Sequence, residues 1–193
     1  MKILMLGPYR KHIIEFLESL GDEVVHYEKK LKAESPILEG VDFIVSYGFQ
    51  FIIKDDVLVR FSRRIINLHI SLLPYNKGAD PNLWSFLEDT PKGVSIHFID
   101  KGVDTGDILA QREIIVPANA TLRTSYDALS KTIEHLFMET WPRIREGKQK
   151  WHSQSENGSK HRLKEKAAYE HLLTEGWDTP VKNLIGKALL EVS

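Results

Sequence analysis

The chain of 193 residues contains no cysteine and only three methionines. Without cysteine it has no disulfide framework, no thiolate metal site and no cysteine nucleophile. This composition fits the reducing cytoplasm, where we expect the protein to be. An excess of one charge is missing too, because 26 Lys and Arg nearly balance 27 Asp and Glu. There is no basic stripe with interleaved aromatic residues, so composition gives no support to a nucleic-acid partner.

Long hydrophobic runs and several familiar motifs are also absent. The apolar run from Met1 to Gly7 is too short for a signal peptide, and no run approaches the roughly 18 apolar residues of a membrane span. The histidines lack the i, i+3 or i, i+4 spacing of a helical metal site, so no metal is expected. Gly7-Pro8-Tyr9-Arg10 replaces the Gly-x-Gly of a dinucleotide-binding fold, and there is no phosphate-binding loop.

The first half of the chain alternates short apolar runs with segments of helical periodicity. This alternation predicts an α/β fold with a doubly wound, mainly parallel sheet and helices on both faces. Ligands of such sheets bind at the carboxyl ends of the strands. The predicted strands cover 2–6, 23–27, 41–47 and 64–69, and the predicted helices cover 11–20 and 54–61.

The second half is organised differently. Residues 71–82 predict a loop and 83–88 a short helix, and two strands at 94–99 and 108–116 suit an antiparallel pair. A long helix is expected from Leu122 to Ile144, opened by a capping box of Thr124 and Asp127. The polar stretch 151–160 predicts a linker. We therefore expect a catalytic domain at 1–150 and a small C-terminal appendage at 151–193, in which the segments 164–173 and 179–190 contain a helix.

Asn67 and His69 are the first candidates for chemistry. Two positions apart on an extended strand, they point to the same face, roughly 7 Å from each other. Asp104 lies in a loop bracketed by Gly102 and Gly106 that would bring a carboxylate beside them. Each feature also has a plain structural explanation, since polar residues often cap strands and Asp-Thr-Gly is ordinary turn chemistry. His97 we interpret as a strand residue whose hydrogen bonds are satisfied locally.

Together the motifs resemble a known family. Asn-x-His-x-Ser-Leu-Leu-Pro at 67–74, followed by Asp-x-Gly-Val-Asp-Thr-Gly-Asp at 100–107, is similar to the folate-dependent formyltransferases. The resemblance covers roughly residues 1–145 and implies a Rossmann-like formyltransferase fold. It places the family's catalytic asparagine, histidine and aspartate on Asn67, His69 and Asp104.

The resemblance implies N10-formyltetrahydrofolate as cofactor and a small amine as acceptor. Asn67 and a protonated His69 would stabilise the oxyanion of a tetrahedral intermediate. Asp104 would favour the imidazolium and relay the proton that the amine loses. In the family the pterin lies between the turn after the third strand and the loop with the aspartate. The cofactor-binding residues implied here are Gln50, Phe51, Ile53, Leu58, Asp100, Gly102 and Val103.

The segment 74–84 looks most like that of sugar N-formyltransferases, so we predict an amino sugar, nucleotide-linked, as acceptor. Glycinamide ribonucleotide formyltransferases carry a glycine-rich phosphate loop after the first strand, which this chain lacks. Methionyl-tRNA formyltransferases add a C-terminal barrel for which too few residues are left. The acceptor-binding residues implied here are Tyr75, Asn76, Lys77, Gly78, Asn82 and Trp84.

Other interpretations stay open at this point. A formyltetrahydrofolate hydrolase would use the same catalytic residues with water as acceptor, and a non-catalytic folate- or nucleotide-binding module would bind without turnover. The activities on glycinamide ribonucleotide and methionyl-tRNA are less favoured but not excluded, and a homodimer is an open option.

Overall fold

The computed structural model describes residues 1–188. They form two compact units, each assembled from separate stretches of the chain. The first unit holds residues 1–69, 96–110 and 137–153, and the second holds 70–95, 111–136 and the residues from 154 onwards. The elements are β1 Lys2–Leu6, α1 Lys11–Ser19, β2 Glu23–Tyr27, η1 Pro36–Leu38, β3 Phe43–Ser46, α2 Asp55–Arg60, β4 Ile65–His69, β5 Lys77–Gly78, α3 Pro81–Leu87, β6 Gly93–Phe98, β7 Ile108–Glu113, α4 Leu122–Arg145, β8 Lys160–His161, η2 Leu163–Leu172, η3 Gly176–Asp178 and η4 Val181–Asn183.

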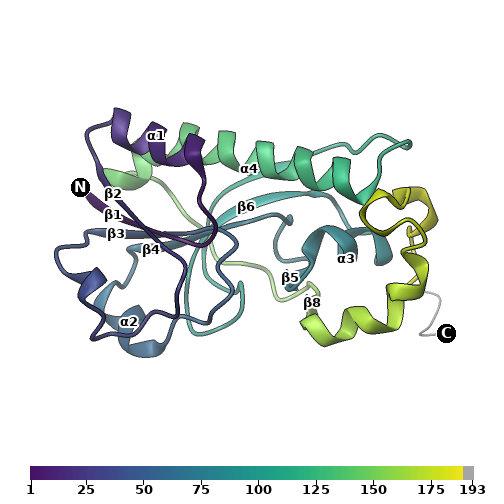
Figure 1. Cartoon of the computed structure of the whole chain (residues 1–193), viewed down its shortest axis with the longest axis horizontal. Helices are drawn as coiled ribbons and strands as arrows, with labels where there is room; N and C mark the ends of the chain where they lie inside the picture. Colours follow the sequence, from purple (N-terminus) through teal and green to yellow (C-terminus); the bar gives the residue numbers. More distant parts are fainter. Residues whose placement is uncertain (189–193) are drawn as a thin grey trace. The chain divides into compact units, whose positions relative to one another are not determined.

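The predicted sheet is confirmed. Strand β1 pairs in parallel with β2 and β3, and β3 pairs in parallel with β4. The strand order in the main sheet is β2-β1-β3-β4-β6-β7. In the first unit, α1 and the end of α4 cover one face of the strands while α2 covers the other (Figure 1). This is the doubly wound α/β arrangement, with β4 delivering its carboxyl end to the ligand-binding edge.

Strand alternation explains how both faces of the first unit are filled. Leu4 and Leu6 of β1 and Ile44 of β3 belong to one apolar cluster. The cluster also contains Val57 of α2 and Phe61, which directly follows α2. Residues at odd positions point to the opposite face. There Phe43 packs edge-on against Trp141 of α4, with ring centroids 5.1 Å apart. A continuous apolar run is therefore the right signal for these strands, since both faces are buried.

A buried carboxylate fixes the end of α4 within the first unit. The Asp22 side chain is fully buried and lies 2.7 Å from the Arg145 guanidinium. It also accepts a hydrogen bond of 3.4 Å from the Trp141 indole. A buried charge is tolerated only when it is paired and hydrogen-bonded, so this contact defines where α4 meets the turn before β2.

The strands β6 and β7 form the predicted hairpin, in which the Phe98 N–H donates to Asp107 O. The Ile99 N–H donates to Ile65 O, so the end of β6 lies beside the start of β4 and the two strands run in opposite directions. This pairing places residues of β6 next to the polar residues of β4. It could not be inferred from the sequence, because it joins segments that are about thirty residues apart.

The second unit is built around α3 and the start of α4. Leu83, Trp84 and Leu87 of α3 pack with Leu122 and Leu184 in one apolar cluster. The chain passes from the first unit to the second between residues 153 and 154, close to the boundary predicted after residue 150, and residues 154–188 group with 70–95 and 111–136. The predicted loop 71–82 contains β5, which pairs in parallel with β8 near the end of the predicted linker 151–160.

Two local predictions need correction. The start of α4 is capped by Thr121 and Thr124, not by Thr124 and Asp127. The Thr121 N–H donates to Thr124 Oγ1 at 2.9 Å, and the Thr124 N–H donates to Thr121 Oγ1 at 3.3 Å. Where the sequence predicts a helix in the C-terminal segments, the structure has the 3-10 helices η2, η3 and η4. Residues 189 and 190 of the predicted segment 179–190 lie outside the described residues.

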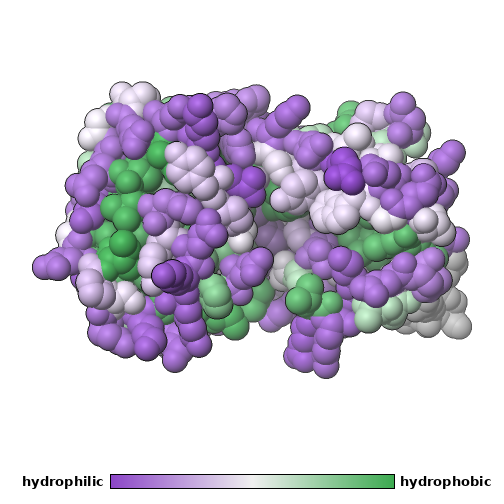
Figure 2. Space-filling view, viewed as in Figure 1, coloured by the Kyte–Doolittle hydropathy of each residue, from purple (hydrophilic) through white to green (hydrophobic). Residues whose placement is uncertain are grey.

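The visible surface of each unit is mostly hydrophilic, with apolar side chains showing in separate strips (Figure 2). In the described part of the chain, no helix combines the length and the apolar character needed to span a membrane.

Candidate functional site

Strand β4 presents two polar side chains to one face of the sheet in the first unit. Asn67 and His69 are separated by the buried Leu68, as the alternation of an extended strand requires. Ile65 and Ile66 are almost fully buried, which anchors the strand in the sheet. His69 ends β4 with a side chain only 8% exposed. The two side chains are thus held by a packed strand and not by a mobile loop.

The loop between β6 and β7 brings Asp104 to this pair, as predicted. Asp104 Oδ1 accepts a hydrogen bond of 3.2 Å from Asn67 Nδ2, and its Oδ2 lies 3.8 Å from His69 Nδ1. The carboxylate is 13% exposed. Asn67, His69 and Asp104 therefore form one cluster of amide, imidazole and carboxylate in which the carboxylate faces both partners.

The conformation of the loop shows how it holds Asp104. The φ angle of Asp104 is +54°, in a backbone region that non-glycine residues seldom adopt and that Asp and Asn tolerate best. Gly106 is required for close packing, because a Cβ there would lie 1.9 Å from Phe98 O. Asp100 closes the loop from the other side, since its carboxylate accepts hydrogen bonds from Gly102 N and Thr105 Oγ1. The motif residues thus shape the turn that delivers Asp104.

His97 is a member of this cluster that sequence reasoning missed. Its side chain is 1% exposed, and its Nε2 lies 3.4 Å from Asp104 Oδ1 and 3.4 Å from Asn67 Nδ2. The expected local bond exists as well, because Nδ1 lies 2.7 Å from Phe98 O. The antiparallel pairing of β6 with β4 is what puts His97 beside Asn67.

One hydrogen bond of His97 assigns one of its protons. Since Phe98 O can only accept, Nδ1 must carry a hydrogen, while Nε2 faces both the amide of Asn67 and the carboxylate of Asp104. Asn67 Nδ2 donates to Asp104 Oδ1 at 3.2 Å and lies 3.4 Å from His97 Nε2. Both contacts are long, so the amide is oriented but can still turn a hydrogen towards a ligand.

The two segments implied for the cofactor lie near each other in the first unit. Lys101 Nζ lies 3.0 Å from Asp55 Oδ2, which joins the aspartate loop to the start of α2. Phe51 is 42% exposed and Val103 is 38% exposed, so both segments leave apolar side chains in solvent. Ile53 and Leu58, in contrast, pack in or against the apolar cluster under α2. Gln50 and Asp100 are exposed, as is Gly102.

The residues implied for the acceptor all lie in the second unit, and they separate into two groups. Tyr75, Lys77 and Gly78 are partly exposed. Asn76, Asn82 and Trp84 are buried. A Cβ at Gly78 would lie 2.2 Å from His161 O, so glycine is needed where β5 pairs with β8.

The buried members of this group have structural partners. Asn82 Nδ2 donates to Leu122 O at 2.9 Å, and its Oδ1 accepts from Ser125 at 2.7 Å. Trp84 stacks on His161, with ring centroids 3.7 Å apart and an interplanar angle of 5°. These contacts stabilise the second unit, so a buried polar or aromatic residue in the motif is explained at least partly by packing.

Glu88 contacts three polar side chains of the second unit. Its carboxylate accepts hydrogen bonds from Asn76 Nδ2 and Ser159 Oγ, and its Oε1 lies 3.0 Å from His161 Nε2. Burial by itself raises the pKa of Glu88, but the approach of His161 and the hydrogen bond from Ser159 outweigh burial and lower the pKa below its ordinary value of 4.5. Glu88 thus fastens the segment around Ser159 to the loop around Asn76.

Glu88→Gln is expected to lower the free energy of unfolding by about 1–3 kcal/mol at neutral pH, the usual size for hydrogen bonds to a charged group. Because the folded pKa lies below the unfolded one, this stabilisation is present above pH 4.5 and is lost as the pH falls through the folded pKa. Urea unfolding from neutral pH to about pH 3 should therefore show the two proteins converging. Asp89→Asn, at the exposed neighbour, should leave stability nearly unchanged at each pH; a difference between wild type and Glu88→Gln that is constant with pH would contradict this role.

No group of three His, Cys, Asp or Glu side chains within residues 1–188 is arranged to hold a metal ion. The cluster of Asn67, His69 and Asp104 consists of groups that can bind and polarise a carbonyl oxygen and move a proton.

Comparison with known proteins agrees with this chemistry. A family model described as formyl transferase matches residues 23–140. Phosphoribosylglycinamide formyltransferase of Bacillus subtilis is 34% identical over 125 residues, which are 62% of this chain and 64% of that protein. Methionyl-tRNA formyltransferase of Finegoldia magna is 40% identical over 89 residues, which are 46% of this chain and 29% of that protein. The chain thus spans less than two thirds of the length of these relatives.

Among solved structures, the formyltransferase PseJ of Anoxybacillus kamchatkensis is 61% identical and has a TM-score of 0.96, covering 97% of this chain and 100% of that chain. Its crystal structure is a complex with UDP-4,6-dideoxy-4-formamido-L-AltNAc and tetrahydrofolate. A 4-N formyltransferase of Francisella tularensis, 20% identical with a TM-score of 0.73, covers 84% of this chain and 76% of that chain and shows the same fold.

Proposed function

Because the chain belongs to the formyl transferase family, we propose that it transfers a formyl group from N10-formyltetrahydrofolate to the amine of a nucleotide-linked amino sugar. The observation that carries the proposal is the contact of Asp104 with both Asn67 and His69 in the first unit. The choice of acceptor is supported by the 61% identity to PseJ, whose crystal structure holds a formamido sugar linked to UDP together with tetrahydrofolate.

The first unit has features that fit the folate. Phe51 and Val103 keep apolar surface exposed on segments that the Lys101–Asp55 contact shows to be near each other, and a flat heterocycle would cover such surface. The exposed Asp100 and Gly102 of the aspartate loop would offer backbone polar groups to the edge of a pterin. When bound, the cofactor supplies a formyl group on nitrogen, an acyl group at the oxidation level of formate.

Asn67 and His69 act on the formyl oxygen. As the amine attacks the formyl carbon, that oxygen gains negative charge, and an amide N–H and an imidazolium N–H are suited to bind it. The contact of Asn67 with Asp104 is long enough to be exchanged for a stronger bond to the charged oxygen. His97 Nε2 lies beside the same amide nitrogen, 3.4 Å from Asn67 Nδ2.

Asp104 has two roles: it pairs with the imidazolium of His69 and it accepts the proton that the amine loses. Its Oδ2 faces His69 Nδ1 at 3.8 Å, so the carboxylate balances the charge of the imidazolium. The attacking amine must lose a proton after the bond to carbon forms, and a partly exposed carboxylate can accept it directly or through a water molecule. The bond between the formyl carbon and the folate nitrogen would then break, that nitrogen would take up a proton to give tetrahydrofolate, and the acceptor would leave as a formamide.

Incubation of the purified protein with N10-formyltetrahydrofolate and UDP-linked amino sugars tests the proposal. We expect a product heavier than the acceptor by one formyl group in place of one hydrogen, formed together with tetrahydrofolate. Formylation of glycinamide ribonucleotide or methionyl-tRNA in preference to amino sugars would reject the acceptor class. Formate release that is undiminished by any amine would instead indicate a hydrolase, and tight folate binding without turnover would indicate a binding module.

The sequence-based expectations of a homodimer and of a cytoplasmic location stay predictions. Gel filtration with light scattering would decide the first. Neither expectation is needed for the proposed chemistry, because Asn67, His69 and Asp104 all belong to the first unit of one chain.

A further inference from the structure

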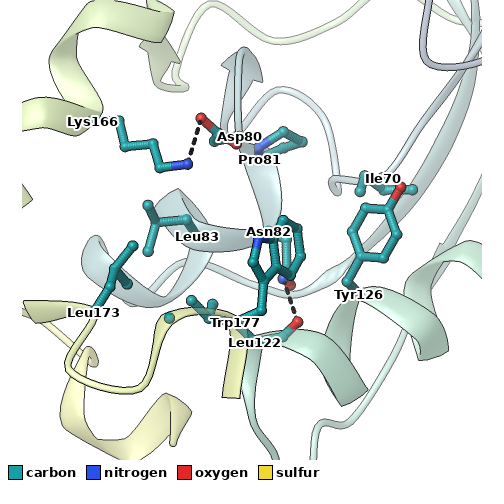
Figure 3. Close-up of a pocket in the computed structure, with 11 residues that line it drawn as sticks. Ile70, Asp80, Pro81, Asn82, Leu83, Leu122, Tyr126, Lys166, Leu173 and Trp177 are labelled. Carbon is teal, nitrogen blue, oxygen red and sulfur yellow. Dashed lines mark hydrogen bonds and ion pairs between the residues drawn. The ribbon is translucent and has the colours of Figure 1, made fainter. Parts of the chain in front are cut away.

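Each unit contains a pocket. In the second unit, the rings of Tyr126 and Trp177 form a corner of one pocket, where they are nearly perpendicular at 84°, and Asn82 also lines this pocket (Figure 3). The first unit holds a pocket of about 270 Å³, which we call the α4-face pocket. None of the residues implied for catalysis, for the cofactor or for the acceptor lines it. Its lining includes Phe43, Arg63, Phe98, Leu109, Ile144 and Trp151.

The α4-face pocket and the catalytic cluster lie on opposite faces of the sheet. Asn67 and His69 point to the same face as Ile65, since they are two and four positions further along β4. On that face, Ile65 belongs to the apolar cluster under α2. Phe43 points to the other face, where it packs against Trp141 of α4. The sheet therefore separates a ligand in the α4-face pocket from the catalytic side chains.

Arg63 contacts two aromatic rings at this pocket. Its guanidinium carbon lies 4.0 Å from the centroid of the Trp151 ring and 4.9 Å from that of the Phe98 ring. The φ angle of Arg63 is +59°, which is uncommon for a residue other than glycine, asparagine or aspartate. Trp151 is held in place because the next residue, His152, exchanges two backbone hydrogen bonds with Ile108 of β7. The guanidinium thus has a defined position although its side chain is 47% exposed.

The Arg63 guanidinium has donors left for a ligand. Its Nη2 pairs with Asp107 Oδ2 at 2.8 Å. A guanidinium carries five N–H groups, so one carboxylate does not use them all. Basic residues also surround the pocket in the sequence, because Arg64 follows Arg63 and the segment 143–150, which contributes Ile144, has four basic residues and one acidic residue. This excess of positive charge favours an anionic ligand.

We propose that the α4-face pocket binds a small aromatic carboxylate. The ring of this ligand would pack against Phe43, Leu109 and Ile144. It would also cover part of Trp151, a large apolar side chain that is 50% exposed. The carboxylate would accept charge-assisted hydrogen bonds from Arg63. Because drug-sized sites usually measure about 300–1,000 Å³, this pocket has room for one or two rings but not for a folate or a nucleotide-linked sugar.

Titration of the isotope-labelled protein with cinnamate tests this proposal. Cinnamamide is the matched control ligand, since it keeps the ring but has no charge. Heteronuclear NMR resolves the indole N–H signals of the four tryptophans. We expect the Trp151 signal to shift and to saturate with a Kd in the low millimolar range or tighter, as for other ligands with few atoms. Cinnamamide should bind about tenfold or more weakly, because it has no charge to pair with Arg63.

Arg63→Gln tests the charged contact. It should raise the Kd of cinnamate about tenfold or more and leave the weak binding of cinnamamide nearly unchanged. Arg64→Gln is the matched control, because the Arg64 guanidinium donates to Asp42 O and Arg60 O. It removes the same charge from the next residue and should change the Kd of cinnamate by less than about twofold. An equal loss in both variants would reduce the site to general attraction by basic residues and overturn the proposal.

Trp151→Ala tests the ring contact and should also raise the Kd of cinnamate about tenfold or more. The backbone signals of Leu109 and Ile144 follow this titration, since the indole signal is lost. Trp151→Phe keeps a ring and should retain most of the affinity. Trp177→Ala, in which a 47% exposed tryptophan of the second unit is removed, should leave the Kd unchanged. The amide spectrum of each variant shows whether it is folded.

Other results would also overturn the assignment. Shifts confined to the Trp84 or Trp177 signals would place cinnamate in the second unit, and equal affinity for cinnamamide would reject an anion site. Saturating tetrahydrofolate should leave the Kd of cinnamate unchanged, so competition between the two would place cinnamate in a folate site instead. A protein that binds cinnamate at Trp151 but does not transfer formyl groups would reject the proposed function alone, because this experiment measures binding and not turnover.

Discussion

Replacement of His69 with alanine is expected to lower kcat by about 10²–10³, the usual loss when one group that stabilises an oxyanion is removed. His69 ends β4 with a side chain that is 8% exposed and faces Asp104. Its imidazolium would bind the formyl oxygen mainly after the amine has attacked, so the loss should appear in kcat more than in either KM. Steady-state kinetics with both substrates varied would measure the two parameters separately.

His12→Ala is the matched control, because His12 is an exposed histidine on α1 of the same unit. It should keep full activity. Thermal unfolding should show that His69→Ala remains folded, since its neighbours on β4 are anchored by the sheet. If His69→Ala kept more than about a tenth of the wild-type kcat, the proposed role in binding the oxyanion would be rejected.

Asp104→Asn is expected to lower kcat by about 10²–10⁴, the range found for positioned acids and bases. The substitution keeps the size of the side chain, and an amide oxygen can still accept the hydrogen bond from Asn67. What is lost is the negative charge that faces His69 and the ability to take the proton from the amine. Binding of tetrahydrofolate should change little, so calorimetry with this ligand separates chemistry from folding of the loop.

Asp107→Asn is the control within the same loop. Its carboxylate pairs with Arg63 at 2.8 Å, with the two side chains 20% and 47% exposed, and exposed ion pairs contribute little. Activity should therefore fall by no more than a few-fold. An equal loss in Asp107→Asn and Asp104→Asn would mean that the charges only shape the loop, and the proton-transfer role of Asp104 would be withdrawn.

The strands of the first unit could be predicted because their signal is local. Ile3, Leu4, Leu6 and Ile44 are buried on both faces of the sheet, so their runs are continuously apolar, as in parallel sheets. The predicted ranges 2–6 and 23–27 match β1 and β2, and those for β3 and β4 differ from the observed strands by one or two residues at an end, which is the normal uncertainty of element ends. The 3-10 helices after residue 160 carry no comparable periodic signal.

Some residues of the motif have a structural explanation beside the functional one. Asn82 and Trp84 stand in a segment that looks like an acceptor site, and both are also buried and bonded within the second unit, so their role in binding stays a prediction. Ile53 and Leu58 pack with the apolar cluster under α2. A motif shows which residue types occur together but not whether a side chain faces a ligand or the core.

By itself, the sequence determined the chemical groups and their order: the pair Asn67 and His69 on one strand face, and Asp104 in a glycine-bracketed turn. These follow from strand alternation and turn chemistry, which act over a few residues. Only the tertiary structure decided that His97 lies beside Asn67 and that Trp177 forms a corner with Tyr126. Such contacts join residues about 30 and 50 positions apart, and they depend on which strands and helices pack together, which no local pattern specifies.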